Sequence, residues 1–163
     1  MEHSVVDLMG IVREEINLYR DLIEHARRKT TLLAQGSVEA ILESNKAEET
    51  FNIKLRTLEN EMIRLCSDLC VAFKIPRDEF TLLKLADGVE QSVASEIRSQ
   101  TNLFKNLVDQ LKTINQRNMK LVECSLHYSR GLLDFISNAT SPYQGTGLFR
   151  PFPAIQTTFS HQA

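Results

Sequence analysis

A stretch in the middle of the chain places an apolar residue alternately at every fourth and every third position. These residues are Phe51, Leu55, Leu58, Met62, Leu65, Leu69 and Ala72. Such spacing puts their side chains on one face of an α-helix, and it is the heptad pattern of helices that pack in left-handed supercoils. A β-strand alternates sides at every residue, so this spacing could not give it one apolar face. The pattern predicts a long amphipathic helix that needs partner helices.

The residues before this stretch follow a similar rhythm. They are Leu8, Val12, Ile16, Tyr19, Ile23 and Ala26. Gly36 and Ser37 interrupt the rhythm. Glycine readily adopts the left-handed conformation that ends a helix, and serine is a preferred residue at the start of the next one. We therefore expect two antiparallel helices joined by a tight turn.

Proline at position 76 should stop the second helix, because it lacks an N–H donor and clashes with the preceding turn. The segment 76–88 then serves as a connector, in which residues 81–86 can form a short helix. A third helix is predicted from about Val89 to Ser137. Its expected core positions are Val93, Ile97, Phe104, Leu107, Leu111, Ile114, Leu121 and Leu132. At 1.5 Å per residue this helix would be roughly 75 Å long.

These elements predict an all-α fold. We expect an elongated antiparallel bundle of three long helices with left-handed coiled-coil packing, a short connecting helix and a flexible C-terminal tail. The bundle should comprise residues 1–138 and the tail residues 139–163. Such lengths fit a bundle better than a compact globule.

The predicted tail differs from the bundle in composition. After Asp134 the only formal charge is Arg150, and three prolines preclude any long helix. The tail holds spaced aromatic and aliphatic residues, namely Tyr143, Phe149, Phe152, Ile155 and Phe159. Spaced anchors of this kind are typical of disordered segments that dock on a partner, and equally of a terminus that packs loosely on its own bundle.

Charge and composition argue against several classes of function. The 21 acidic and 19 basic residues alternate along the chain, so no face offers the positive potential that nucleic acid requires. The basic cluster at 27–29 lies near the expected end of the first helix, where cations offset the helix dipole. Charged residues interrupt every early apolar run, which predicts a cytoplasmic protein without membrane insertion.

The cysteines and the absence of catalytic motifs predict neither a cofactor nor an enzyme. Cys66, Cys70 and Cys124 are expected to be reduced and to serve packing, since no further ligands lie nearby for a metal. Phosphate-binding loops and nucleophile elbows are missing. One alternative remains: His127, followed by Arg130 and Gly131, resembles the phosphorylated histidine of phosphotransfer bundles.

A polar residue occupies a core position of the third helix. Asn118 follows Ile114 and precedes Leu121 at helical spacing. In a coiled coil such an asparagine fixes the register, because shifting it would bury an amide without a partner. Asn118 is therefore either a register-setting residue or part of a binding element.

Several short motifs, taken in order, resemble the FlgN family of flagellar export chaperones. These are Leu18-Tyr19-Arg20-Asp21-Leu22, the break at Gly36, Leu58-Glu59, Thr81-Leu82, Asn115-x-x-Asn118-x-x-Leu121-Val122, Ser125-Leu126-x-Tyr128 and Tyr143-Gln144-Gly145. They cover nearly the whole chain. The sequence departs from the family pattern at Gln144, where a glycine would be expected, and in a longer, more aromatic tail.

The resemblance implies a chaperone of a type III secretion system. It would bind the C-terminal helices of hook-associated proteins, prevent their premature assembly and deliver them to the cytoplasmic domain of the export gate. The third helix offers the candidate face for this partner, because its apolar residues lie on more than one stripe. The candidate partner-binding residues are Asn115, Asn118, Leu121, Val122, Leu126, Tyr128, Leu132, Leu133 and Ile136. The alternative is that these apolar residues are buried against the first two helices. Tyr143 and Gly145 would dock on the gate. A structural coiled-coil adapter is a further alternative, and the sequence leaves open whether the chain forms a homodimer.

Overall fold

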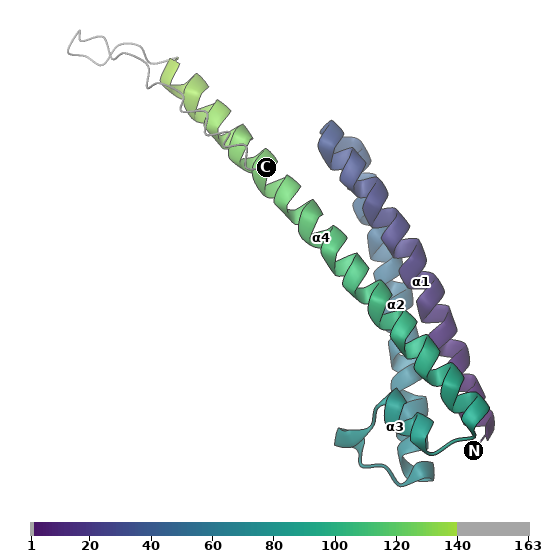
Figure 1. Ribbon diagram of the computed structural model, residues 1–163. Coiled ribbons are helices and arrows are strands. Elements are labelled where there is room, and N and C mark those ends of the chain that lie inside the picture. Colours follow the sequence, from purple (N-terminus) through teal and green to yellow (C-terminus); the bar gives the residue numbers. More distant parts are fainter. Residues whose placement is uncertain (1, 140–163) are drawn as a thin grey trace, which may run out of the picture. The chain divides into compact units, whose positions relative to one another are not determined.

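The computed structural model describes residues 2–139, with side chains for residues 4–137. Its elements are α1 (Glu2–Gln35), α2 (Val38–Phe73), the 3-10 turn η1 (Arg77–Glu79), α3 (Leu82–Asp87) and α4 (Gln91–Ala139) (Figure 1). The prediction of three long helices and a short connecting helix is confirmed. The chain divides into two compact units, Met1–Val122 and Glu123–Ala163.

The turn between α1 and α2 forms where the sequence predicts it. Gly36 has a φ of 70°, in the left-handed region, and its N–H donates to the Leu32 carbonyl over 3.0 Å. Ser37 occupies the first capping position of α2, but its side chain makes no capping hydrogen bond. Glycine geometry, and not a serine cap, therefore defines this turn.

The long helices of the first unit alternate in direction. Residues early in α1 pack near Leu69, whereas Lys29, late in α1, forms an ion pair with Glu48. Residue numbers rise along α1 as they fall along α2, so these two helices are antiparallel. Tyr19 contacts Phe104, with ring centroids 4.9 Å apart, and Thr30 contacts Asn118. Numbers rise together in these pairs, so α1 and α4 are parallel.

The connector between α2 and α4 is held by local hydrogen bonds. Lys74 adopts a left-handed conformation that ends α2, and the Ile75 N–H donates to the Cys70 carbonyl over 3.0 Å. After Pro76 and η1, the Thr81 hydroxyl accepts a hydrogen bond from the Lys84 N–H over 3.1 Å. This cap starts α3, which confirms the short helix predicted at residues 81–86.

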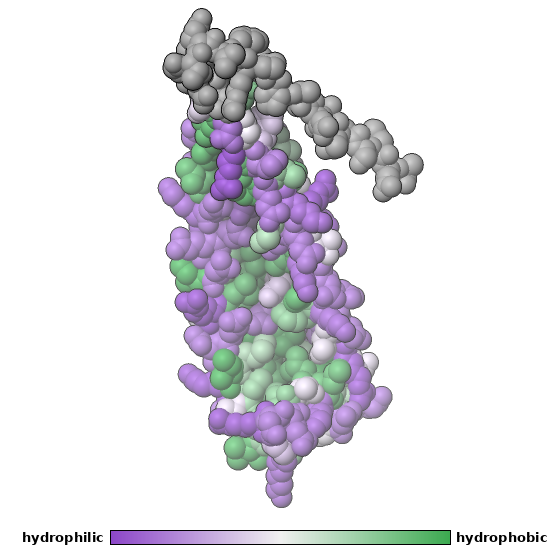
Figure 2. All heavy atoms as spheres, turned by 90° about the vertical axis from the view of Figure 1, so that its left-hand side faces the viewer, coloured by the Kyte–Doolittle hydropathy of each residue, from purple (hydrophilic) through white to green (hydrophobic). Residues whose placement is uncertain are grey.

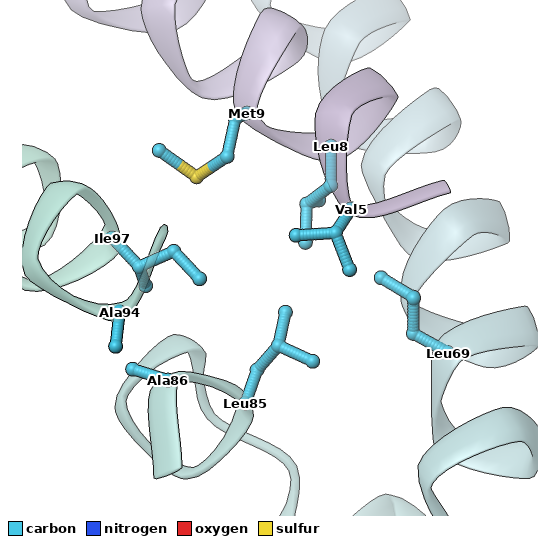
Figure 3. Close-up of a cluster of buried hydrophobic side chains, with 8 residues drawn as sticks. All are labelled: Val5, Leu8, Met9, Leu69, Leu85, Ala86, Ala94 and Ile97. Atoms are coloured by element: carbon cyan, nitrogen blue, oxygen red, sulfur yellow. The ribbon is translucent and has the colours of Figure 1, made fainter. Parts of the chain in front are cut away.

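Four helices meet in one apolar cluster. Its buried members are Val5, Leu8 and Met9 from α1, Leu69 from α2, Leu85 and Ala86 from α3, and Ala94 and Ile97 from α4 (Figure 3). Burying each large side chain here contributes about 1.5–3 kcal/mol of stability. The cluster shows why α3 belongs to the fold: it closes one end of the first unit.

Outside this cluster the helices expose a mixed surface. On the face shown in Figure 2, apolar side chains lie in patches among more numerous polar ones. Every residue from 122 to 137 is exposed, whereas most apolar residues of α1 at helical spacing are buried. The burial of α4 side chains therefore changes along the length of this helix.

Some details of the sequence-based prediction are wrong. The basic residues 27–29 do not lie in the last turn of α1, because the helix continues to Gln35. Ala72 and Leu132, expected in the core, are exposed, and so is Cys124. Apolar spacing marks one face of a helix, but burial also requires a neighbouring element there. α4 starts at Gln91, two residues after the predicted Val89.

Candidate binding surface

The C-terminal part of α4 exposes large apolar side chains. The exposed fractions are 52% for Leu126, 73% for Tyr128, 47% for Leu132 and 63% for Leu133. Val122 and Ile136 are exposed as well, while Leu121 is half-buried. Exposed apolar side chains that gather on one element make this part of α4 a candidate binding surface.

These side chains form two stripes along α4. At 3.6 residues per turn, Met119, Val122, Leu126 and Leu133 fall on one side of the helix. We call this set the leucine stripe. Leu121, Tyr128 and Leu132 form the tyrosine stripe, centred roughly 130° away by the same geometry. Glu123, His127, Arg130 and Asp134 lie together on another side of the helix, which is polar.

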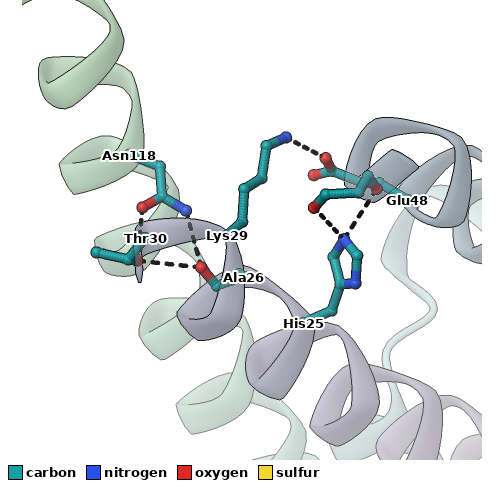
Figure 4. A network of polar contacts seen from close by, with 7 residues as sticks. His25, Ala26, Lys29, Thr30, Glu48 and Asn118 are labelled. Atoms are coloured by element: carbon teal, nitrogen blue, oxygen red, sulfur yellow. Dashed lines mark hydrogen bonds and ion pairs between the residues drawn. The ribbon is translucent and has the colours of Figure 1, made fainter. Parts of the chain in front are cut away.

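Asn118 is buried where α4 packs against α1. It is 6% exposed, its Nδ2 donates to the Ala26 carbonyl over 2.9 Å, and its Oδ1 accepts from the Thr30 hydroxyl over 2.6 Å (Figure 4). Both ends of the amide are thus satisfied inside the first unit. Such bonds fix how far α4 is advanced along α1, because any shift would leave a buried amide unpaired.

Next to Asn118, polar contacts join α1 to α2. His25 Nε2 lies 3.0 Å from the Ser44 carbonyl oxygen, and Lys29 forms an ion pair with Glu48 (Figure 4). His25 is also stacked at an angle on Phe51, with ring centroids 5.6 Å apart. These contacts hold α1 and α2 together at the level where Asn118 packs.

A cleft of about 330 Å³ lies at this level of the first unit. Its lining residues are Lys29, Leu33, Glu48, Asn115, Asn118, Met119 and Val122. Met119 and Val122 are also the first two members of the leucine stripe. Met119 and Val122 thus line a cleft formed by three helices of the first unit, and the buried Asn118 fixes the position of α4 at that cleft.

Met119 is a surface residue that the sequence-based site prediction missed. It is exposed and lies one turn before Val122 and two turns before Leu126. The heptad spacing of these residues was available in the sequence as a signal. The prediction instead followed the Asn115-to-Val122 motif, in which Met119 is an unspecified position.

A buried carboxyl group lies elsewhere, between α1 and α2. Glu15 is 4% exposed. Burial, together with the nearby Glu59 carboxylate, raises the pKa of Glu15 to about 7. Burial and the charges of Glu15 and Glu59 also raise the pKa of Tyr19. The environment thus favours the protonated form of Glu15.

The remaining predicted site residues lie either on the exposed part of α4 or beyond the described residues. Tyr143 and Gly145 lie outside the described residues. His127 and Asn115 are exposed on α4. Within residues 4–137 no three His, Cys, Asp or Glu side chains gather closely enough to hold a metal ion. Among the described helices, none is long and apolar enough to cross a membrane.

Comparison with known proteins identifies a family. The model of the family described as "FlgN protein" matches residues 1–149. The matched region includes all the described helices and both stripes of α4. No curated protein and no solved structure matches the chain.

Proposed function

The chain belongs to the FlgN family of flagellar export chaperones, and from this premise we propose that its leucine stripe binds the C-terminal helix of a hook-associated protein. Family membership makes the chain a chaperone and not an enzyme. The alternative of phosphotransfer at His127 is therefore set aside. Binding of hook-associated proteins follows from the family, whereas the residues that bind them are our proposal.

The observation that supports this proposal is the exposure of Leu126 and Leu133 on α4. They continue the spacing of Met119 and Val122, which matches the i, i+3, i+7 contacts of a helix bound along a helical surface. Covering each of these leucines contributes about 1.5–3 kcal/mol in the limit of full burial.

Such binding explains how a chaperone prevents premature assembly. A terminal client helix that is covered by α4 is not available to other copies of the client. Delivery is the second part of the proposal: Tyr143 and Gly145 dock on the cytoplasmic domain of the export gate, as the family resemblance implies. Both steps would take place in the cytoplasm.

Replacing leucines of the stripe with glutamate tests the client surface. We expect Leu126→Glu and Leu133→Glu each to weaken binding of a hook-associated C-terminal peptide by at least about tenfold, since tenfold corresponds to only about 1.4 kcal/mol. Isothermal titration calorimetry measures this change. Glutamate is a good helix former, so α4 should stay helical.

Gln116→Glu provides the matched control, because Gln116 is also exposed on α4 but lies off both stripes. It should bind the peptide as the unmodified chain does. The proposal fails if the unmodified chain shows no binding at micromolar concentrations, or if the leucine variants bind as well as this control.

Tyr143→Ala tests the division between client binding and delivery. We expect the variant to keep its affinity for the client peptide and to lose affinity for the gate domain, because truncating an aromatic hot-spot residue costs about 2 kcal/mol or more. Parallel titrations with the two partners measure both. Equal loss of both affinities would contradict separate sites.

A further inference from the structure

The apolar arc of α4 is wider than one client helix can cover. The leucine and tyrosine stripes together span about 180° of the helix, whereas the apolar face of an amphipathic helix spans about 100° or somewhat more. Building on the proposed function, a client on the leucine stripe would leave Tyr128 and Leu132 uncovered by that client. Both side chains are substantially exposed to solvent in the structure.

We propose that residues 140–163 of this chain pack on the tyrosine stripe of α4. The segment begins directly after the last residue of α4, Ala139. Doubling back from there to Tyr128 requires a path of about 17 Å along the helix. An extended chain from residue 140 to Phe152 spans up to about 40 Å, so Phe149 and Phe152 can reach the stripe.

The chemistry of the segment fits this surface. It has no acidic residue, and Arg150 is its only formal charge. No strong charge repulsion therefore opposes its approach to a stripe of leucine and tyrosine side chains. Its prolines at 142, 151 and 153 disfavour a helix and favour an extended strand of chain. Phenylalanine rings on such a strand can pack against Tyr128 and Leu132.

Covalent attachment favours residues 140–163 over a separate molecule as the occupant of the tyrosine stripe. A short flexible connection gives a tethered segment an effective concentration in the millimolar range. Weak apolar contacts then suffice for occupancy. With the tyrosine stripe covered by its own chain, α4 presents only one apolar stripe, whose width suits a single client helix.

Leu132 and Leu133 offer a matched pair for the test, because these neighbours lie on different stripes. A nitroxide label is attached to Cys124, one turn before Tyr128. It broadens the signals of backbone amides that come close to the tyrosine stripe. Cys124 is exposed, and Cys66→Ser with Cys70→Ala restricts labelling to it. The full chain carries nitrogen-15, and the signals of residues 143–159 are followed by nuclear magnetic resonance.

We expect the nitroxide to broaden the amide signals around Phe149 and Phe152. Leu132→Glu should abolish the broadening, whereas Leu133→Glu should retain the broadening and lose client binding. Tyr128→Glu should reproduce the effect of Leu132→Glu. Circular dichroism verifies that all variants keep their helices.

The outcomes separate the two proposals. Unbroadened tail signals, or equal broadening in the Leu132 and Leu133 variants, would overturn the tail contact. In a further sample, nitroxide-labelled copies without nitrogen-15 are mixed with nitrogen-15 copies without nitroxide. Broadening that appears only in this mixture would also overturn the tail contact, because the tail would then bind the stripe of a second copy. If the tail results hold but no variant and no unmodified chain binds the peptide, only the client proposal fails.

Discussion

At the scale of single residues, Glu15 shows how packing changes the chemistry of a side chain. In an unfolded chain its carboxyl group has an ordinary pKa of 4.5, and in the fold burial and Glu59 raise that pKa to about 7. The folded chain therefore holds a proton that the unfolded chain releases between these values. The contribution of the Glu15 proton to the free energy of unfolding is fully present below pH 4.5 and is lost as the pH rises towards 7.

Glu15→Gln should remove this pH dependence. We expect the unmodified chain to lose up to about 3 kcal/mol of unfolding free energy between pH 4.5 and 8, since one pKa unit is worth about 1.4 kcal/mol. The variant should change less over this range and should be the more stable chain at pH 8. Urea unfolding at both pH values measures the difference.

Glu14→Gln is the control for this prediction, because Glu14 is exposed next to Glu15. It should follow the pH profile of the unmodified chain. Identical profiles for the unmodified chain and Glu15→Gln would show that the raised pKa of Glu15 does not contribute to stability.

At the scale of the elements, a glycine can stabilise or destabilise the fold, depending on the backbone conformation at its position. Gly36 has a positive φ in the turn after α1, whereas Gly10 lies inside α1. A Cβ atom at either position would meet no atom within 4 Å. Both positions therefore have space for a side chain, and the two glycines differ in backbone conformation.

Alanine at these glycines should change stability in opposite directions. Gly36→Ala should cost about 1–2 kcal/mol, because a side chain disfavours the left-handed conformation. Gly10→Ala should add about 0.5–1 kcal/mol, because glycine is the poorer helix former. Urea unfolding of both variants measures this, and a change of the same sign in both would contradict the argument.

At the scale of the whole molecule, the first unit depends on a core that elements distant in sequence complete together. Leu8, Leu69, Leu85 and Ile97 come from α1, α2, α3 and α4, and none of them is exposed. The short α3 contributes Leu85 and Ala86 to this core. We therefore treat α3 as a structural part of the bundle and not as a simple linker.

Two leucines of α3 test this role. Leu85→Ala should lower the unfolding free energy by about 2–5 kcal/mol, because it leaves a cavity in the core. Leu83→Ala, at an exposed position of the same helix, should change it by less than about 1 kcal/mol. Urea unfolding checks both values, and similar losses would mean that α3 does not complete the core.

The sequence alone determined the helices and their breaks. Heptad spacing is a local property, so it marked α1, α2 and α4 without knowledge of the fold. Gly36 ends α1 through its own backbone, and α2 ends at Phe73, shortly before Pro76, so both breaks lie close to where the sequence predicts them. The burial of Asn118 also followed from its spacing between apolar residues.

Only the tertiary structure decided which apolar side chains are buried. The spacing of apolar residues continues along α4 without a change at Val122, yet Ile97 is buried and Leu126 is exposed. Spacing specifies a face, whereas burial depends on whether another element covers it. The same reason accounts for Glu15, which reads in the sequence as a surface charge and becomes buried because α1 packs against α2.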